Sequence, residues 1–332
     1  METQLSFSTA DLAQTRFAVS PMWEVVTSYR VLHAGADAGP HRRWAAQVRP
    51  RLVEAGLDRG WLAELVPPTR YVADFLNPTP GSPFPTLDTE LDAILRTTAA
   101  QLESDLDSLA DAAPPGSRPA ARLRVLREAP EAALEKIVAE IRAYWELGLA
   151  PYWARVRDVL EADVFHRARQ VAEHGVAHVL NELHESVTWD AGSLRLVRRH
   201  CTLSRDETGA GLLLVPSAFA WPRVFTRSVP PEPPQLAYPA RGIGTLWEPR
   251  TTAAAEAVAA VIGKSRTLLL TELDTPASTT QLARHSGLSA AGVSQHLTAL
   301  RDAGLVTAHR AGRSVLYART TVADALLSAG AV

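Results

Sequence analysis

The chain has 332 residues, more than one typical domain, and hydrophobic residues make up 46% of it, which is enough to build sizeable cores. Its formal net charge is −2. This balance excludes a general nucleic-acid coat, so any surface that binds nucleic acid must be local.

The cysteine content and the apolar runs indicate where the protein works. Cys201 is the only cysteine, so neither an intrachain disulfide nor a two-cysteine metal site can form, and we expect a reduced, cytoplasmic protein. The first 20 residues contain Glu2, Asp11 and Arg16 and no continuous apolar block, which argues against a secretion signal. No stretch reaches about 18 uncharged apolar residues, so we expect no membrane-spanning helix.

The first half of the chain alternates between helical periodicity and proline-rich loops. Pro21 suits the first turn of a helix over residues 20–32, because its fixed φ matches the helix and its missing N–H costs nothing there. Further helices are expected over residues 41–55, 58–65, 87–109 and 130–183, the last of them bent near Gly148 and Pro151. The intervening loops are expected at residues 34–40, 67–68, 77–85 and 112–119, where proline and glycine recur.

Alternating apolar residues then favour β-structure. Short strands are expected over residues 193–200, 211–216, 223–228 and 235–238, with a loop at 230–234. We expect them to form a small antiparallel sheet. The fold class predicted is therefore α+β, predominantly α, with an N-terminal domain over residues 1–248 and a second domain over residues 252–332.

The last quarter of the chain has the spacing of two helices joined by a tight turn. Ser278 or Thr279 can cap the first helix, and Gly287 stands where that helix must end and the chain reverse. Ser289 is a natural N-cap for the second helix. Its apolar positions Val293, Leu297 and Leu300 are spaced by four and three, which predicts one buried stripe.

Two predicted strands follow, over residues 305–310 and 314–319, joined by Ala311, Gly312 and Arg313. This order of elements is typical of a winged helix-turn-helix, which inserts one helix into a major groove. The alternative is an amphipathic helical hairpin with a terminal β-hairpin that packs on the rest of the protein. Local charge favours DNA, because only the acid Asp302 opposes five arginines between residues 279 and 320: Arg284, Arg301, Arg310, Arg313 and Arg319.

Residues 294–306 match the pattern Ser-x-His-Leu-x-x-Leu-x-x-x-Gly-Leu-Val, and by this pattern the segment resembles the ArsR family of bacterial repressors. Residues 16–24, 214–222 and 238–247 are similar to an uncharacterised domain fused ahead of such modules in high-GC Gram-positive bacteria. The resemblance implies a dimeric transcription factor whose N-terminal part pairs subunits or receives a signal.

We therefore expect a sequence-specific DNA-binding regulator, a repressor by this resemblance, with double-stranded DNA carrying an inverted repeat as its partner. The recognition helix would span residues 289–303 and the wing residues 305–319. Small, amide and hydroxyl side chains can approach base edges, and wing arginines can contact phosphates. The residues expected to contact DNA are Ser289, Ala290, Ala291, Ser294, Gln295, Thr298, Arg301, Arg310 and Arg313.

Metal and cofactor chemistry is not expected. The ligand positions of metal-sensing ArsR proteins do not carry over, because residues 281–285 contain no cysteine and residues 322–332 contain no histidine. His174, His178 and Glu182 are each four residues apart, so on one helix they would share a face. They could hold zinc with a fourth ligand from elsewhere. Solvated polar residues on a helix explain the same pattern, and we predict no metal and no cofactor.

Enzyme signatures are also absent from the sequence. Ser217 lacks the flanking glycines of a nucleophile elbow and is expected to satisfy a turn, and Cys201 is expected to be a buried structural thiol. Trp221 and Trp247 are expected in core packing, although they could line a ligand cavity. Two other functions stay open beside the regulator. One is a sensor whose N-terminal domain binds a small apolar effector; the other is a scaffold or enzyme that uses the wing fold for protein contacts.

Overall fold

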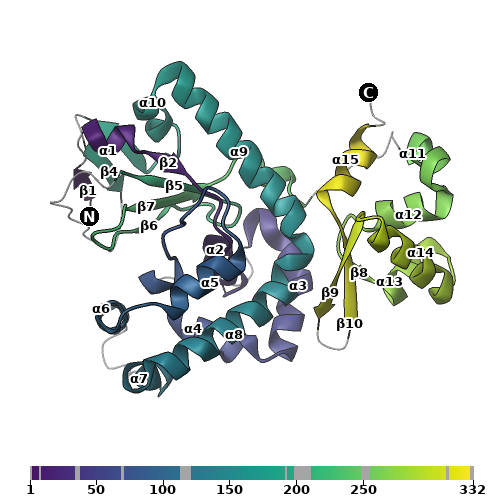
Figure 1. Cartoon of the computed structure of the whole chain (residues 1–332), viewed down its shortest axis with the longest axis horizontal. Coiled ribbons are helices and arrows are strands. Elements are labelled where there is room, and N and C mark those ends of the chain that lie inside the picture. Colours follow the sequence, from purple (N-terminus) through teal and green to yellow (C-terminus); the bar gives the residue numbers. More distant parts are fainter. Residues whose placement is uncertain are drawn as a thin grey trace. The chain divides into compact units, whose positions relative to one another are not determined.

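The computed structural model (Figure 1) describes residues 2–6, 9–33, 38–68, 71–112, 121–190, 193–197, 211–247, 255–311 and 314–329. It divides into two compact units. The first comprises Met1–His41, Arg59–Glu140 and Val159–Ile243, and the second comprises Arg42–Asp58, Ile141–Asp158 and Gly244–Val332. The helices α8 (Pro130–Gly148) and α9 (Trp153–His174) each contribute residues to both units.

Helices make up most of the first unit. Besides its parts of α8 and α9, it contains α1 (Thr9–Ala13), α2 (Pro21–His33), α4 (Trp61–Leu65), α5 (Leu87–Leu95), α6 (Ala99–Asp111), α7 (Ala121–Glu128) and α10 (Val176–Asn181). Short 3-10 turns are η1 (Gly39–His41) and η3 (Asp74–Leu76) in this unit, and η2 (Leu57–Arg59) and η5 (Ile243–Thr245), which lie at the unit boundaries in the sequence.

Two small sheets complete the first unit. One has the order β1 (Glu2–Ser6), β4 (Ser193–Val197), β3 (Val187–Asp190) and is antiparallel throughout. The other has the order β2 (Arg16–Phe17), β5 (Leu213–Ser217), β7 (Gln235–Pro239), β6 (Phe225–Arg227). Here β6 and β7 pair antiparallel as expected, but β2–β5 and β5–β7 pair parallel.

The parallel pairs correct the expectation of a purely antiparallel sheet. The central strand β5 is buried at every position, as strands covered on both faces are. On one side Leu214, Leu236 and Tyr238 join a core cluster with Val179 of α10. On the other side Val215 and Ala237 pack with Trp23 of α2.

The single helix expected over residues 87–109 is two helices. α5 ends at Leu95, and α6 begins after Thr98, whose side chain accepts a hydrogen bond from the N–H of Gln101. A side chain that bonds the backbone in this way is an N-cap and favours a new helix start over continuation. The sequence Thr97-Thr98 contained this signal, although the apolar periodicity runs across it.

The long helical stretch from residue 130 is broken at the places predicted and once more. The 3-10 turn η4 (Ala150–Tyr152) separates α8 from α9 at Pro151. A second break lies at Gly175, which has a φ of +84° and precedes α10. Only glycine adopts this left-handed conformation readily, so the helix cannot continue through it unchanged.

An aromatic cluster organises part of the second unit. α3 (Arg42–Glu54) places Trp44 beside Trp247, with ring centroids 6.3 Å apart. Tyr152 meets Trp247 edge-on at 5.6 Å, and the indole N–H of Trp44 donates to the carbonyl of Gly148 at 2.9 Å. Trp247 is therefore a packing residue, as expected, whereas Trp221 in the first unit is 46% exposed.

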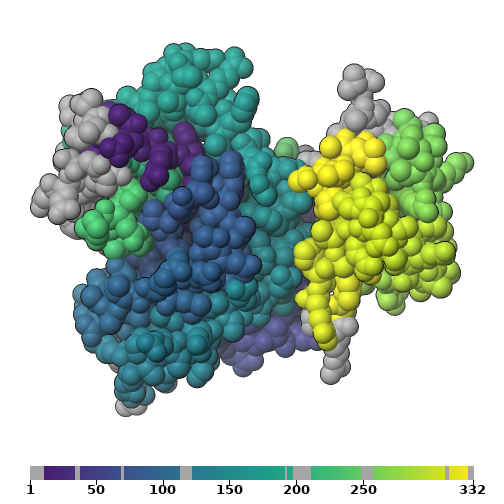
Figure 2. Space-filling model, in the orientation of Figure 1, coloured from purple at the N-terminus to yellow at the C-terminus, as the bar shows by residue number. Residues whose placement is uncertain are grey.

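The C-terminal part of the second unit has the element order of a winged helix-turn-helix. Its helices are α11 (Ala255–Ile262), α12 (Lys264–Glu272), α13 (Thr279–Ser286), α14 (Ala290–Asp302) and α15 (Thr321–Ala329). The strands β8 (Ala277–Ser278), β10 (Ser314–Arg319) and β9 (Val306–Ala311) form an antiparallel sheet in that order. The side chains of this C-terminal module form a continuous yellow-to-green surface in Figure 2.

The predicted fold class is confirmed: the described residues are mainly helical, with small and mostly antiparallel sheets, and the C-terminal region fits a winged helix-turn-helix. Among these described residues, no helix combines the length and apolarity needed to span a membrane.

Candidate nucleic-acid interface

The turn between α13 and α14 is built from local hydrogen bonds. Ser278 and Gln281 form a capping box at the start of α13: the N–H of Gln281 donates to Oγ of Ser278 at 3.3 Å, and the N–H of Ser278 donates to Oε1 of Gln281 at 2.8 Å. At the other end Gly287 has a φ of +71°, which lets the chain reverse at once. The two helices are therefore joined by the short turn that the sequence predicts.

α14 is held at its N-terminus by a side-chain cap and along one face by core packing. Oγ of Ser289 accepts the N–H of Gly292 at 3.1 Å, which makes Ser289 the N-cap predicted. Val293, Leu297 and Leu300 are 0–1% exposed and belong to one core cluster with residues of α12 and α15. This buried stripe leaves the opposite face of α14 in solvent.

The other face of α14 carries the predicted contact residues. Ala290, Ala291, Ser294, Gln295 and Thr298 are all exposed. Positions 291, 294 and 298 are spaced by three and four, so their side chains lie along one line, with Gln295 beside it. Oγ1 of Thr298 donates to the carbonyl of Ser294 at 3.0 Å, which commits its one proton and leaves the hydroxyl oxygen as an acceptor.

Arg301 occupies a different part of the same helix. It lies in the last turn of α14, about 16 Å from Ala290 at the usual rise per residue. Its guanidinium is 3.2 Å from the carboxylate of Asp302, and both side chains are more than half exposed. Such a surface pair contributes little and leaves the guanidinium accessible.

The hairpin β9–β10 corresponds to the predicted wing. Arg310 pairs with Val315 in its register, and both side chains are exposed. Gly312 and Arg313, which join the two strands in sequence, lie outside the described residues. Of the wing residues predicted to contact DNA, the structure therefore places Arg310 on the surface, and the role of Arg313 stays a prediction from the sequence.

Arg319 corrects the count of basic residues on this face. Its side chain is only 5% exposed and lies 3.0 Å from the carboxylate of Asp324 and 3.2 Å from that of Asp274. It also donates to the carbonyl of Leu270 at 3.1 Å. Arg319 is thus part of a buried ionic cluster, which Arg155 joins by donating to the carbonyl of Asp274 at 2.9 Å. Because it is enclosed, Arg319 cannot contribute to the basic surface as its position in the sequence suggested.

His309 on β9 also faces the protein rather than solvent. Its side chain is 17% exposed, with Nδ1 3.6 Å from a carboxylate oxygen of Glu146. Burial lowers the pKa of His309, and the carboxylate of Glu146 opposes that shift. The exposed arginines in the described part of this module between residues 279 and 319 are therefore Arg284, Arg301 and Arg310.

The histidine cluster is divided by a helix break. His174 ends α9 and His178 lies in α10, after Gly175. Their rings still meet edge-on at 4.8 Å, and Glu182 is the C-cap of α10. Within the residues that the structure describes, no three or more His, Cys, Asp or Glu side chains gather as they would around a metal ion.

Ser217 has the structural role expected of it, at the end of β5. Its Oγ is 3.0 Å from Oγ1 of Thr27 and accepts the N–H of Phe219 at 3.3 Å. Cys201 lies outside the described residues, so its burial stays a prediction.

Comparison with known proteins identifies two segments. Residues 267–308, which run from within α12 to the first half of β9, match the family "Bacterial regulatory protein, arsR family". Residues 100–244 match a family of unknown function (DUF5937). No curated protein and no solved structure matches the chain. The chain thus contains an arsR-family regulatory domain, the mark of a DNA-binding transcriptional regulator, behind a domain of a family of unknown function.

Proposed function

We propose that the chain is a sequence-specific DNA-binding repressor, and not an enzyme, whose helix α14 enters the major groove while the wing contacts the phosphate backbone. The observation that carries this proposal is the division of α14 into a buried apolar stripe and an exposed face of small and polar side chains. A helix of this kind is anchored firmly and can still approach base edges closely.

The geometry suggests separate roles along the module. Ser294 and Gln295, in the first half of α14, would read bases, and Thr298 would accept a hydrogen bond because its proton is already engaged. The free N–H groups around Ser289, Ala290 and Ala291 at the helix N-terminus suit a phosphate or a base acceptor. These residues would set both the register and the sequence preference.

The arginines would contribute charge rather than base recognition. Arg301 lies about 16 Å along the helix from its N-terminus, which favours a contact with the DNA backbone. Arg310 is exposed on the wing, and Arg313 is expected to act with it. Contacts of this kind position the protein and carry little sequence information.

A homodimer would bring two recognition helices to successive major grooves, about 34 Å apart on one face of the DNA. Two exposed valines support an association surface: Val261 of α11 is 79% exposed and Val322 of α15 is 60% exposed, and α11 packs against α15. An inverted-repeat operator follows from a two-fold dimer.

Selection of bound fragments from random or genomic DNA tests this function directly. The expected result is enrichment of an inverted repeat whose half-sites are one helical turn apart, or a multiple of it, together with a dimer mass in light scattering. Recovery of no preferred sequence would instead favour a scaffold that uses the module for protein contacts. A strict monomer, both free and on DNA, would contradict the dimer.

Replacing Gln295 with alanine should separate base reading from backbone binding. The change is expected to cost about 1–3 kcal/mol on the selected site and little on random DNA, because an amide can pair bidentately with a base edge. Replacing Arg310 with methionine should instead weaken all sequences similarly and flatten the slope of log affinity against log salt by about one unit. Fluorescence anisotropy titrations at several salt concentrations measure both effects.

Gln281 offers a matched control for Gln295, since it is an exposed glutamine in the same module that is already engaged in the capping box. A Gln281→Ala change should affect stability more than base preference. The docking proposed here would be wrong if Gln295→Ala weakened specific and random DNA alike, or if Arg310→Met left the salt slope unchanged.

A further inference from the structure

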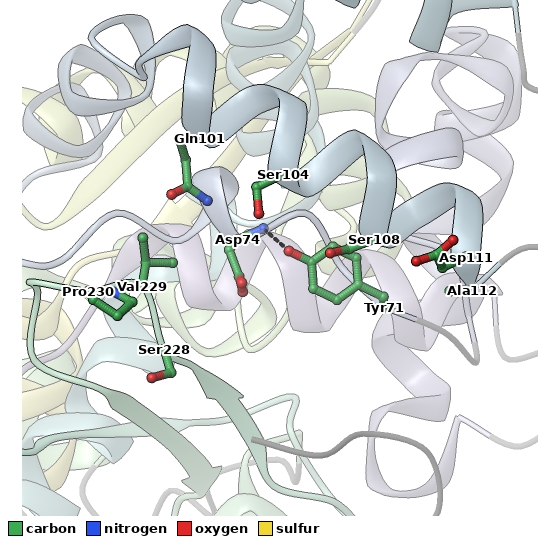
Figure 3. A pocket seen from close by; sticks show the side chains of 10 residues that line it. All are labelled: Tyr71, Asp74, Gln101, Ser104, Ser108, Asp111, Ala112, Ser228, Val229 and Pro230. Atoms are coloured by element: carbon green, nitrogen blue, oxygen red, sulfur yellow. Dashed lines mark hydrogen bonds between the residues drawn. The ribbon is translucent and has the colours of Figure 1, made fainter. Parts of the chain in front are cut away.

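The first unit contains a cleft of about 620 Å³ alongside α6 (Figure 3). Its walls come from α6, from the segment that contains Tyr71 and Asp74, and from residues 228–230 between β6 and β7. The volume lies within the range usual for small-molecule sites, but most such sites are lined mainly by apolar side chains. Seven of the ten described residues that line this cleft have polar or charged side chains, so it offers several hydrogen-bonding groups to a ligand.

The α6 wall is a stripe of polar side chains on one helix face. Gln101, Ser104, Ser108 and Asp111 are spaced by three, four and three residues, which brings them into one row. The row extends for about 15 Å along the helix. Two members of the row are serines, whose short side chains leave room in the cleft for an elongated molecule. Figure 3 shows these side chains along the edge of the cleft.

A buried carboxylate holds part of this wall in position. Asp105 is 1% exposed and accepts hydrogen bonds from the hydroxyl of Tyr71 at 2.8 Å and from the amide nitrogen of Gln101 at 2.9 Å. Burial, and then the carboxylates of Asp74 and Asp105, raise the pKa of Tyr71, so its hydroxyl stays protonated. With its amide nitrogen engaged, Gln101 can offer its amide oxygen to a ligand as an acceptor.

The charged side chains among the described residues that line the cleft are acidic. Asp74 and Asp111 line it, and no cationic side chain is among the described residues that do. Asp111 is the last residue of α6, where the helix dipole already presents partial negative charge and a cation is the favoured neighbour. The nearby arginine Arg227 donates to the carbonyl of Asp74 and to Thr79, so its guanidinium is directed to protein acceptors.

We propose that this cleft binds an extended molecule that carries several ammonium groups, of the chemical class of aliphatic polyamines. Asp74 and Asp111 would each receive an ammonium group, and the serine hydroxyls and the amide oxygen of Gln101 would accept other N–H groups of the ligand. The site is separate from the DNA-contacting face proposed above and does not depend on it. It differs from the apolar effector site considered from the sequence, because two carboxylates line it.

Calorimetric titration of the full-length protein with spermidine at low ionic strength tests the proposal. We expect one saturable site per chain, and no saturable binding of the neutral polyol sorbitol. A double change, Asp74→Asn with Asp111→Asn, should weaken spermidine binding by at least roughly tenfold, because the charge-assisted hydrogen bonds to two ammonium groups are lost. Asp92→Asn on α5, an exposed position that does not line the cleft, is the matched control and should change affinity less than twofold.

A second variant tests the cleft without changing either carboxylate. Ser104 is exposed on the wall, so Ser104→Trp should fill the cleft and abolish spermidine binding while leaving the charge and the circular dichroism unchanged. The proposal is overturned if spermidine does not saturate one site, if Asp92→Asn weakens binding as much as the double change, or if Ser104→Trp binds like the wild type.

Discussion

Replacing Arg319 with methionine is expected to lower the free energy of unfolding of the C-terminal module by about 3 kcal/mol, within the range for breaking buried ion pairs. Methionine keeps most of the apolar stem, so the change chiefly removes charge. Without the guanidinium, Asp324 and Asp274, now 3.0 and 3.2 Å from it, would lose their shared cation, and Asp274 would keep Arg155, whose guanidinium is 3.3 Å from its carboxylate. Hydrogen exchange of the amides in α12 and α14 measures this loss in the full-length protein.

Arg310→Met on the neighbouring strand is the matched control, because Arg310 is exposed. It should change stability by less than about 0.5 kcal/mol. The effects on DNA binding should be reversed. Arg310→Met should flatten the slope of log affinity against log salt, whereas Arg319→Met, under conditions where it is folded, should keep the slope of the wild type. Equal losses of stability in the two variants would show that Arg319 is not the buried cation described.

Replacing Glu24 with glutamine is expected to stabilise the protein at alkaline pH. Glu24 is fully buried in α2, and its two carboxylate oxygens accept the N–H of Ala218 at 3.2 and 3.1 Å. Burial raises the pKa of Glu24 to about 8, against the opposing hydrogen bonds from Ser217 and Ala218. Glutamine has the same shape and accepts the same N–H but never ionises.

The sign of the pH dependence follows from the raised pKa. Between the ordinary glutamate pKa and about 8, the native state holds a proton that the unfolded chain releases, so stability is greatest at acidic pH and falls as the pH rises. The fall due to Glu24 is on the order of 4 kcal/mol. Urea titrations from pH 5 to pH 8.5 should show a flatter dependence for Glu24→Gln and, at pH 8.5, a more stable variant than the wild type.

Part of the pH dependence of stability should remain in the Glu24→Gln variant because of Glu90, whose pKa is raised to about 7 by burial. Glu103→Gln, at an exposed position of α6, is the control and should leave the pH dependence of the wild type intact. If Glu24→Gln had the same slope as the wild type, the carboxyl of Glu24 would be ionised in the native protein and the burial described for it would be wrong.

The helix-turn-helix could be predicted because its determinants are local in sequence. Caps such as Ser289, the left-handed glycine at position 287 and the stripe of Val293, Leu297 and Leu300 act within one or two turns of helix. The structure accordingly has each of these residues in its predicted place. The DNA contacts themselves are not tested by the fold and stay predictions.

The order of strands in the N-terminal sheets could not be predicted from the sequence. β2 is two residues long and pairs with β5, which lies almost 200 residues later. Neither strand length nor alternation indicates whether such distant segments run parallel, because hydrophobic period gives the faces of a strand and not its partner. For the same reason the sequence did not predict the cleft beside α6, because its lining comes from three separate segments of the chain.

The sequence by itself determined the helical caps, the turn glycines and the buried stripe of α14, because these depend on backbone conformation and side-chain period within a few residues. Only the tertiary structure decided which charged side chains are buried and which are exposed. Arg319 and Arg310 are both wing arginines, yet one meets Asp274 and Asp324 in the interior and the other faces solvent. Glu24 is likewise enclosed although its sequence neighbours do not require it. Charge becomes surface or core according to which distant residues enclose it, and this depends on packing between segments far apart in the chain.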